Sequence, residues 1–283
     1  MTSAGGSTSG ASGGSAGFGA GGTTAVGGGS GSKDGGAVDA PSVETAPPDT
    51  APIDTASPFK MPVLNYTEYE PPFDPTTIPG IRPLFDGETL TGWNYDPKVW
   101  SVVNNYMKCT SDNTFAGTLE SFSEFRLFVS SRQVSGQYGQ TGYGFYGTQP
   151  PKGQWNGEAW KFVYLVGPTC IWWDYVTQSN DGTLNCQINM EKAPYNLPRQ
   201  GKPGPWWQHE FLFSMSKGTI RGALNGVDFL NFKLSAAAHK DRAAFTSTPI
   251  GFLGHFTNTE VRYKDVWIEV NPREPDKLYS VKK

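Results

Sequence analysis

The amino-acid sequence predicts an all-β protein whose folded part is an antiparallel β-sandwich. Short runs that alternate apolar and polar residues recur between residues 100 and 270, as expected for half-buried strands. Clusters of Gly, Pro, Asn and Asp separate these runs at short intervals, which is typical of sandwiches. Helix signals are almost absent, because only the Ala-rich run at residues 234–245 has the composition of a helix.

The strand candidates follow one another as hairpins would. Residues 100–110 alternate around a predicted turn at Asn104 and Asn105, and residues 124–134 alternate apolar and polar side chains. Asn225 and Gly226 separate two further candidates, and an Asn-Gly pair at this point predicts a type I′ hairpin turn. The remaining candidates are residues 161–167, 170–176, 183–190, 208–216, 250–256 and 261–270.

The composition divides the chain into a tether and one folded domain. Residues 1–58 are rich in Gly and Ser and then in Pro and Thr, and no tryptophan occurs before Trp93. Such a segment cannot bury enough apolar surface to offset its chain entropy, so we expect a disordered tether. We expect a linker arm at residues 59–80, the sandwich at residues 81–271 and a C-terminal tail at residues 272–283.

The charge distribution argues against nucleic acid as a partner. Residues 1–58 contain five carboxylates and only Lys33, a net charge of −4, so the whole-chain charge of −3 leaves +1 for residues 59–283. A near-neutral domain has no electrostatic footprint for nucleic acid.

No apolar run reaches the ~18 residues of a membrane span. No signal peptide follows Met1, yet Gly/Ser tethers commonly follow a cleaved lipoprotein anchor, so we expect a bacterial protein that is exported or tethered to the cell surface.

The three cysteines, Cys109, Cys170 and Cys186, have no CxxC spacing and therefore do not indicate a zinc site. Cys170 and Cys186 flank the "SNDG" turn and would pair only if the hairpin loop were longer than that turn implies. Free, buried thiols are the expected state, because unpaired Cys packs as a small hydrophobe.

Four segments in order carry a family resemblance: "LFDGETLTGWNYDPKVWSVVNNYMKCTSD", "TLESFSEFRLFVSSRQ", "KPGPWWQHEFLFSMSKGTIRGALNGVDF" and "TPIGFLGHFTNTEVRYKDVWIEV". Their order resembles the bacterial domain family named for 3-keto-disaccharide hydrolases, and the resemblance covers residues 84–270. It implies a concanavalin-A-like jelly roll with a sugar site on the concave sheet. It also implies a hydrolase or lyase that acts on the glycosidic bond of 3-keto-glycosides.

The resemblance points to Asp174 and His255 as catalytic residues. Family members often carry "E-x-Q-x-x-D" on a central strand, and here only the Asp of that motif remains, as Asp174. The closing "L-Q-x-H" of the family becomes "FLGH", which keeps the His as His255. A base and an acid are what elimination from a 3-keto-glycoside requires. A divalent cation could also stabilise the enolate, although the sequence contains no ligand cluster for a metal.

Strand alternation suggests which residues bind the substrate. In a regular strand Trp172 and Asp174 share one face and Trp173 lies on the other. We expect Trp172 and Asp174 on the concave surface, where an indole and a carboxylate suit a sugar, and Trp173 in the core. The alternative is that Trp172 is a core residue and Asp174 caps the following turn.

The strand candidate at residues 208–216 offers a second set of substrate-binding residues. His209 shares its parity with the aromatic residues and is expected to face the core. Gln208 and Glu210 then point the opposite way and could line the groove. Two other classes of function stay open: a carbohydrate-binding module or surface lectin without chemistry, and a purely structural surface domain.

Overall fold

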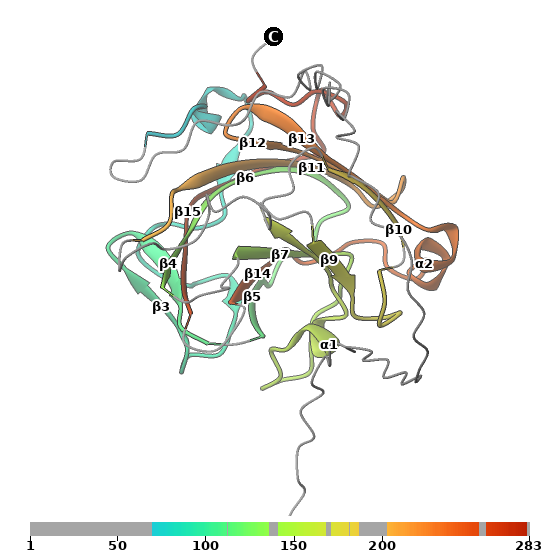
Figure 1. Ribbon diagram of the computed structural model, residues 1–283, viewed down its shortest axis with the longest axis horizontal. Coiled ribbons are helices and arrows are strands. Elements are labelled where there is room, and N and C mark those ends of the chain that lie inside the picture. The colour runs from blue at the N-terminus through green and yellow to red at the C-terminus, as the bar shows by residue number, and fades with distance from the viewer. Residues whose placement is uncertain are drawn as a thin grey trace, which may run out of the picture. The chain divides into compact units, whose positions relative to one another are not determined.

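The computed structural model describes residues 70–111, 113–135, 141–167, 171–180, 182–186, 203–254 and 259–281. The predicted tether and the first half of the linker arm, residues 59–69, lie outside these residues. Within them the chain folds into two antiparallel sheets that pack face to face, and the larger sheet arches over the smaller one (Figure 1). The predicted all-β sandwich is therefore confirmed.

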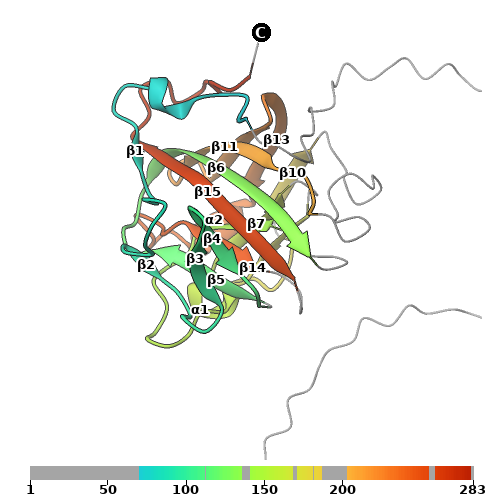
Figure 2. The same ribbon diagram turned by 90° about the vertical axis from the view of Figure 1, so that its left-hand side faces the viewer.

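The larger sheet has nine strands, and every neighbouring pair is antiparallel. Its two longest strands, β6 and β15, lie side by side across the sandwich (Figure 2). The order along the sheet is β10-β13-β12-β11-β6-β15-β4-β3, with β1 paired to β15. The bounds are β1 Arg82–Pro83, β3 Trp100–Val103, β4 Tyr106–Cys109, β6 Glu124–Ser135, β10 Gly182–Cys186, β11 Trp207–Ser214, β12 Thr219–Leu224, β13 Val227–Leu234 and β15 Glu260–Val270.

The smaller sheet has six antiparallel strands in the order β2-β5-β14-β7-β8-β9. Its strands are β2 Trp93–Asn94, β5 Thr114–Thr118, β7 Thr141–Phe145, β8 Val163–Gly167, β9 Ile171–Asp174 and β14 Gly251–Gly254. The sequence pattern does not predict β5 or β7, because both contain glycine, which is depleted in strands. These two strands flank β14 at the centre of the sheet.

Turn chemistry fixes two hairpins as predicted. Asn225 and Gly226 both have positive φ, at 45° and 83°, and they connect β12 to β13 as a two-residue type I′ turn. Asn104 and Asn105 likewise have positive φ, at 48° and 63°, between β3 and β4. Asn tolerates the left-handed region better than most residues, so both turns follow from local sequence.

Helices are few and short in the described part of the chain: η1 Pro75–Thr77, α1 Gly157–Trp160 and α2 Ala236–Asp241. Helix α2 lies within the predicted Ala-rich run. Its N-cap is Ser235, whose hydroxyl oxygen accepts a hydrogen bond from the Ala238 N–H at 2.9 Å.

The core between the sheets is strongly aromatic. Phe252 of β14 stacks on Tyr263 of β15, with ring centroids 4.7 Å apart, and Phe125 stacks on Phe213 at 4.6 Å. Offset stacking of this kind adds to the free energy gained from burying apolar surface. Cys109 is buried at the margin of this core and is free, as predicted for the cysteines; Cys170 and the side chain of Cys186 lie outside the described residues.

Two terminal segments cover the outer face of the larger sheet. Residues 70–79 and 271–281 meet there, where Phe73 stacks between Phe128 of β6 and Tyr279. Both segments lie above β6, β11 and β12 in Figure 1. They enclose polar side chains that strand alternation would otherwise expose to solvent.

Candidate functional site

Strand β9 directs Asp174 into the protein. The carboxylate is fully buried and forms an ion pair with Arg242, which follows α2 and is also fully buried. Its Oδ1 also accepts hydrogen bonds from the N–H groups of Val176 and Thr177, at 2.7 and 3.3 Å. Asp174 therefore caps the turn after β9, which is the alternative given in the sequence analysis. The prediction that Asp174 is exposed on the concave surface is wrong.

The expected positions of the two tryptophans are reversed. Trp172 is 6% exposed and packs edge-on against Phe232 of β13 in the core, with ring centroids 5.0 Å apart. Trp173 points the other way and is only partly buried. The reason is the register of β9 with β8, because Trp172 lies opposite the buried Leu165 whereas Trp173 lies opposite Tyr164. Both faces of "IWWDY" are aromatic, so alternation alone does not decide between them.

Glu210 lies on the outer face of the larger sheet, as its parity predicts, and the protein itself occupies its side chain. Its carboxylate is fully buried and pairs with Nε of Arg126 at 2.9 Å. The N–H groups of Tyr279 and Ser280 donate to it, both at 2.8 Å. Glu210 thus fastens the C-terminal segment to the sheet.

Gln208 has the same role for the other terminal segment. Its side-chain amide donates to the carbonyl oxygen of Phe73 at 2.7 Å and accepts from the Phe73 N–H at 3.1 Å. Because both hydrogen bonds are made within the chain, the amide is not presented to a groove. The predicted parity of Gln208 is confirmed, and a substrate-binding role for it stays a prediction.

His209 faces the core, as predicted. Its Nδ1 lies 2.9 Å from the hydroxyl of Tyr143, and the Tyr143 hydroxyl donates to the Ser131 hydroxyl at 2.8 Å. Burial lowers the pKa of His209 to about 3, so the ring is neutral at physiological pH. His255, the second predicted catalytic residue, lies outside the described residues.

A row of glycines runs across the outer face of the smaller sheet. Gly117, Gly251 and Gly144 lie opposite one another on β5, β14 and β7. A Cβ atom at Gly117 would lie 2.4 Å from the ring of Trp160, and one at Gly144 would lie 2.5 Å from the ring of Phe162. The two rings stack at 5.2 Å with planes 8° apart, so only glycine lets them lie flat on the sheet.

The same row continues into Tyr164 of β8 and Trp173 of β9, which lie directly opposite each other. Tyr175 packs against Tyr164, with centroids 5.6 Å apart. Trp173 and Tyr175 remain partly exposed, and we call Tyr164, Trp173 and Tyr175 the outer aromatic surface. Partly exposed Tyr and Trp rings offer an apolar face together with a polar edge. Phe162 and Tyr164 alternate with the inward-facing Val163 and Leu165, so "FVYL" was the sequence signal that could have identified this face.

The described residues contain no group of three or more His, Cys, Asp or Glu side chains placed to hold a metal ion. The divalent cation that the reaction could use therefore stays a prediction. No helix within the described ranges is both long enough and apolar enough to cross a membrane.

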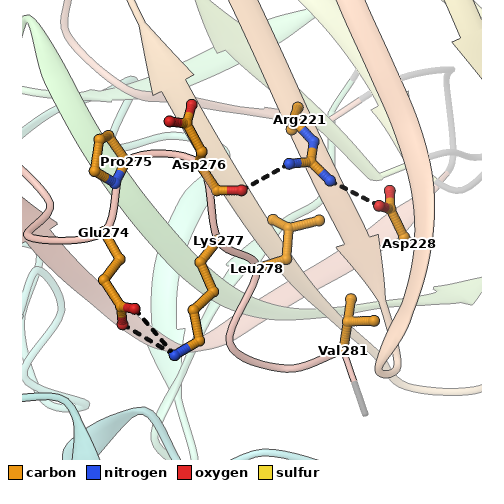
Figure 3. Close-up of a pocket in the computed structure, with 8 residues that line it drawn as sticks. All are labelled: Arg221, Asp228, Glu274, Pro275, Asp276, Lys277, Leu278 and Val281. Atoms are coloured by element: carbon orange, nitrogen blue, oxygen red, sulfur yellow. Dashed lines mark hydrogen bonds and ion pairs between the residues drawn. The ribbon is translucent and has the colours of Figure 1, made fainter. Parts of the chain in front are cut away.

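A pocket of about 500 Å³ opens between the C-terminal segment and the β12–β13 hairpin (Figure 3). Leu278 and Val281 form an apolar part of its lining, and charged residues surround them. These charges are already paired, because Arg221 binds Asp228 at 2.8 Å and Lys277 binds Glu274 at 3.0 Å. Exposed pairs of this kind contribute little energy, and none of these groups is arranged as a base beside an acid. The pocket is a crevice left where the C-terminal segment docks.

Comparison with known proteins gives one extended match to a family. The model of a family described as 3-keto-alpha-glucoside-1,2-lyase-like domain matches residues 80–269. No curated protein matches the sequence.

Several solved structures have a related arrangement of strands. A presumed glycosyl hydrolase from Parabacteroides distasonis is 21% identical with a TM-score of 0.46, over 68% of this chain and 94% of that one. A Bacillus subtilis protein of unknown function with a galectin-like fold is 11% identical with a TM-score of 0.45, over 67% and 94%. A carbohydrate-binding module from Bacillus subtilis is 10% identical with a TM-score of 0.38, over 64% and 98%.

Proposed function

Because the chain belongs to the family of 3-keto-alpha-glucoside-1,2-lyase-like domains, we propose that it cleaves the glycosidic bond of 3-keto-glycosides by elimination followed by hydration. The observation that carries this proposal is the extent of the match. Residues 80–269 include strands of both sheets, from β1 to all but the last residue of β15.

The reaction depends on the ketone at C3 of the sugar, which acidifies the hydrogen on C2. A base removes that proton, and the electron pair forms an enolate that is stabilised by donors at the C3 oxygen. The C1–O bond then breaks, the leaving oxygen takes a proton from an acid, and a C1–C2 double bond remains. Water adds across this bond, with hydroxyl to C1 and hydrogen to C2, so the net change is hydrolysis. This route differs from that of ordinary glycosidases, which need a fixed pair of carboxylates.

His255 is the residue to which the proposal gives the proton transfer. The unperturbed pKa of histidine is close to neutral, which suits a group that both removes and returns a proton. It follows directly on β14, the strand that carries Gly251 of the glycine row. Asp174 is not assigned this role, because its carboxylate is buried and committed to Arg242.

The outer aromatic surface is the proposed platform for the sugar. Aromatic rings bind sugars through the apolar C–H face of the pyranose. The ring of Trp173 is partly exposed and therefore available for such a contact, whereas Trp172 is enclosed in the core. We also propose that the protein is located on the outside of a bacterial cell. Fractionation of cells that express the native gene would test this location.

The test is to incubate the full chain in deuterated water with a 3-keto-glucoside and, separately, with the same glucoside before oxidation. Elimination and hydration should release the aglycone only from the 3-keto form and should place deuterium on C2 of the sugar. The variant His255→Ala should lose this activity, and His239→Ala is the matched control. Release of the aglycone from both glucosides without deuterium at C2 would contradict the mechanism.

A second candidate is a carbohydrate-binding module without chemistry. The burial of Asp174 favours it, because this removes one of the two groups that the sequence suggested for proton transfer. Calorimetric titration separates the two candidates. A binding module should bind the glycoside without turnover, and Trp173→Ala should weaken that binding.

A further inference from the structure

Three arginines are buried in the part of the sandwich that the structure describes, and one of them differs from the other two. Arg126 and Arg242 are 0% and 1% exposed, and each is paired with buried carboxylates. Arg132 is 9% exposed, and no carboxylate of the described residues forms an ion pair with it. A buried charge without a counter-charge is costly, so the exception calls for a ligand.

The guanidinium of Arg132 lies on the outer face of the larger sheet, near the end of β6. Its Nε and Nη2 both donate to the carbonyl oxygen of Gly204, at 3.1 and 2.7 Å. The group also lies over the ring of Trp206, 5.2 Å from its centroid. Both contacts orient the guanidinium, but neither supplies a negative charge. Burial, together with the neighbouring Arg262, holds the pKa of Arg132 below its usual value.

Strand register aligns this arginine with two more cations. Arg262 of β15 lies directly opposite Arg132 on one side and directly opposite Lys108 of β4 on the other. Lys108, Arg262 and Arg132 thus form a row across three adjacent strands, which we call the cation row. Like charges that face each other across a sheet are destabilising, so Arg132 and Arg262 repel each other across β6 and β15.

The carboxylates near the cation row neutralise only part of its charge. Glu260 pairs with Lys108 at 3.2 Å and with Arg262 at 2.5 Å. Lys264, whose Nζ lies 4.8 Å from the centroid of Trp206, has Asp265 at 3.8 Å. Within the described residues the three cations of the row therefore share one paired carboxylate, that of Glu260, so positive charge predominates there. The side chains of Lys108, Arg262 and Lys264 are 29%, 23% and 27% exposed, so solvent reaches the patch.

We propose that the cation row binds the acidic group of an anionic glycan, a carboxylate or a sulfate, with Arg132 as its anchor. The planar guanidinium presents parallel N–H donors that match such oxyanions. Tyr106, which lies under Arg262 with its ring centroid 4.5 Å away, adds an aromatic edge beside the charges.

Two features favour a glycan over a nucleic acid. The row is only three residues wide, which suits one acidic group and not a long phosphate backbone. The folded domain is otherwise close to neutral, as the sequence shows. The site lies on the opposite sheet from the outer aromatic surface, so it does not depend on the proposed lyase activity.

Affinity electrophoresis of the full chain tests the proposal, in gels that contain polygalacturonate, dextran sulfate or neutral dextran. An acidic polysaccharide should retard the protein, the retardation should weaken at high ionic strength, and neutral dextran should have no effect. Retardation by polygalacturonate alone would assign a carboxylate ligand, and retardation by dextran sulfate alone a sulfate ligand. Arg132→Gln should weaken the binding at least about tenfold, as expected for loss of a buried charge-assisted contact.

Two further variants keep the test decisive if Arg132→Gln is unstable. The double variant Lys108→Gln/Lys264→Gln changes only partly exposed side chains and should also weaken binding. Arg82→Gln is the control, because Arg82 is an exposed arginine already paired with Glu120 at 2.6 Å. Equal binding of all variants, or equal retardation by neutral dextran, would overturn the proposal. Tighter binding of duplex DNA that requires the same residues would overturn the assignment to a glycan.

Discussion

The substitution Asp174→Asn should lower the free energy of unfolding substantially, although it changes only one charge. Asn retains an oxygen that can still accept the N–H groups of Val176 and Thr177. The main effect is therefore that Arg242 loses its counter-charge. Its other hydrogen bonds are donated to the neutral carbonyl oxygens of Tyr146 and Ala238. The side chains of both partners of the ion pair are 0% exposed, so no solvent screens the charge that remains.

The magnitude follows from that burial. Removing one partner of a buried ion pair typically costs about 3–5 kcal/mol, because the other charge is left uncompensated. A domain with a total stability of roughly 5–15 kcal/mol would lose a large fraction of it. Equilibrium urea unfolding measures the change as a lower midpoint at an unchanged slope.

A double-mutant cycle identifies the cause. Arg242→Met removes the cation and retains most of the apolar volume, so Asp174→Asn/Arg242→Met should cost less than the sum of the two single substitutions. If Asp174→Asn lowers the stability by less than about 1 kcal/mol and the cycle shows no coupling, the ion pair does not stabilise the fold as described. Loss of activity in Asp174→Asn would then be evidence for a catalytic carboxylate.

Three further predictions concern the core and the glycine row. The pKa of His209 is lowered to about 3 in the folded protein, against about 6.5 when unfolded, so the unfolded state binds the proton more readily. The free energy of unfolding should therefore be highest above about pH 6.5 and should fall by about 2 kcal/mol between pH 7 and 5. His209→Gln should remove most of this pH dependence. Urea unfolding at a series of pH values measures it, and an equal pH dependence in the variant would contradict the prediction. Trp172→Ala should cost about 3–5 kcal/mol and Trp173→Ala clearly less; the reverse order would restore the placement expected from the sequence. Gly144→Ala should cost roughly 1–3 kcal/mol by overpacking, because its Cβ would lie 2.5 Å from the ring of Phe162; a neutral effect in thermal unfolding would mean that this ring can move away.

Local chemistry made much of the fold predictable. The turns at Asn104–Asn105 and Asn225–Gly226 depend only on residues that tolerate positive φ, and both form where the sequence places them. The inward orientation of His209 was predictable for a similar reason, because its strand is aromatic on one face only. Where neighbouring residues carry the information, alternation and turn preference suffice.

The predictions that were wrong or missing concern residues whose partners are distant in sequence. Asp174 faces inward, where it pairs with the buried cation of Arg242, 68 residues later in the chain. The sequence of the strand itself does not predict this partner. Strand β7, "TGYGF", carries a composition that argues against a strand. Gly144 is explained by the ring of Phe162, which packs on it, and Gly142 by the side chain of Leu253, which would lie 3.0 Å from a Cβ atom there. A single sequence does not state such pairings, so the candidate site was less predictable than the fold.

The attachment of both terminal segments to one sheet determines how the domain can be mounted on a support. Residues 70–79 and 271–281 end on the outer face of the larger sheet, where Gln208 holds one segment and Glu210 the other. The outer aromatic surface lies on the opposite sheet. A linker fused at either end of the folded region would therefore leave from the side away from the aromatic rings. Immobilised on a sensor chip or a bead through either linker, the domain would turn its outer aromatic surface toward the solution.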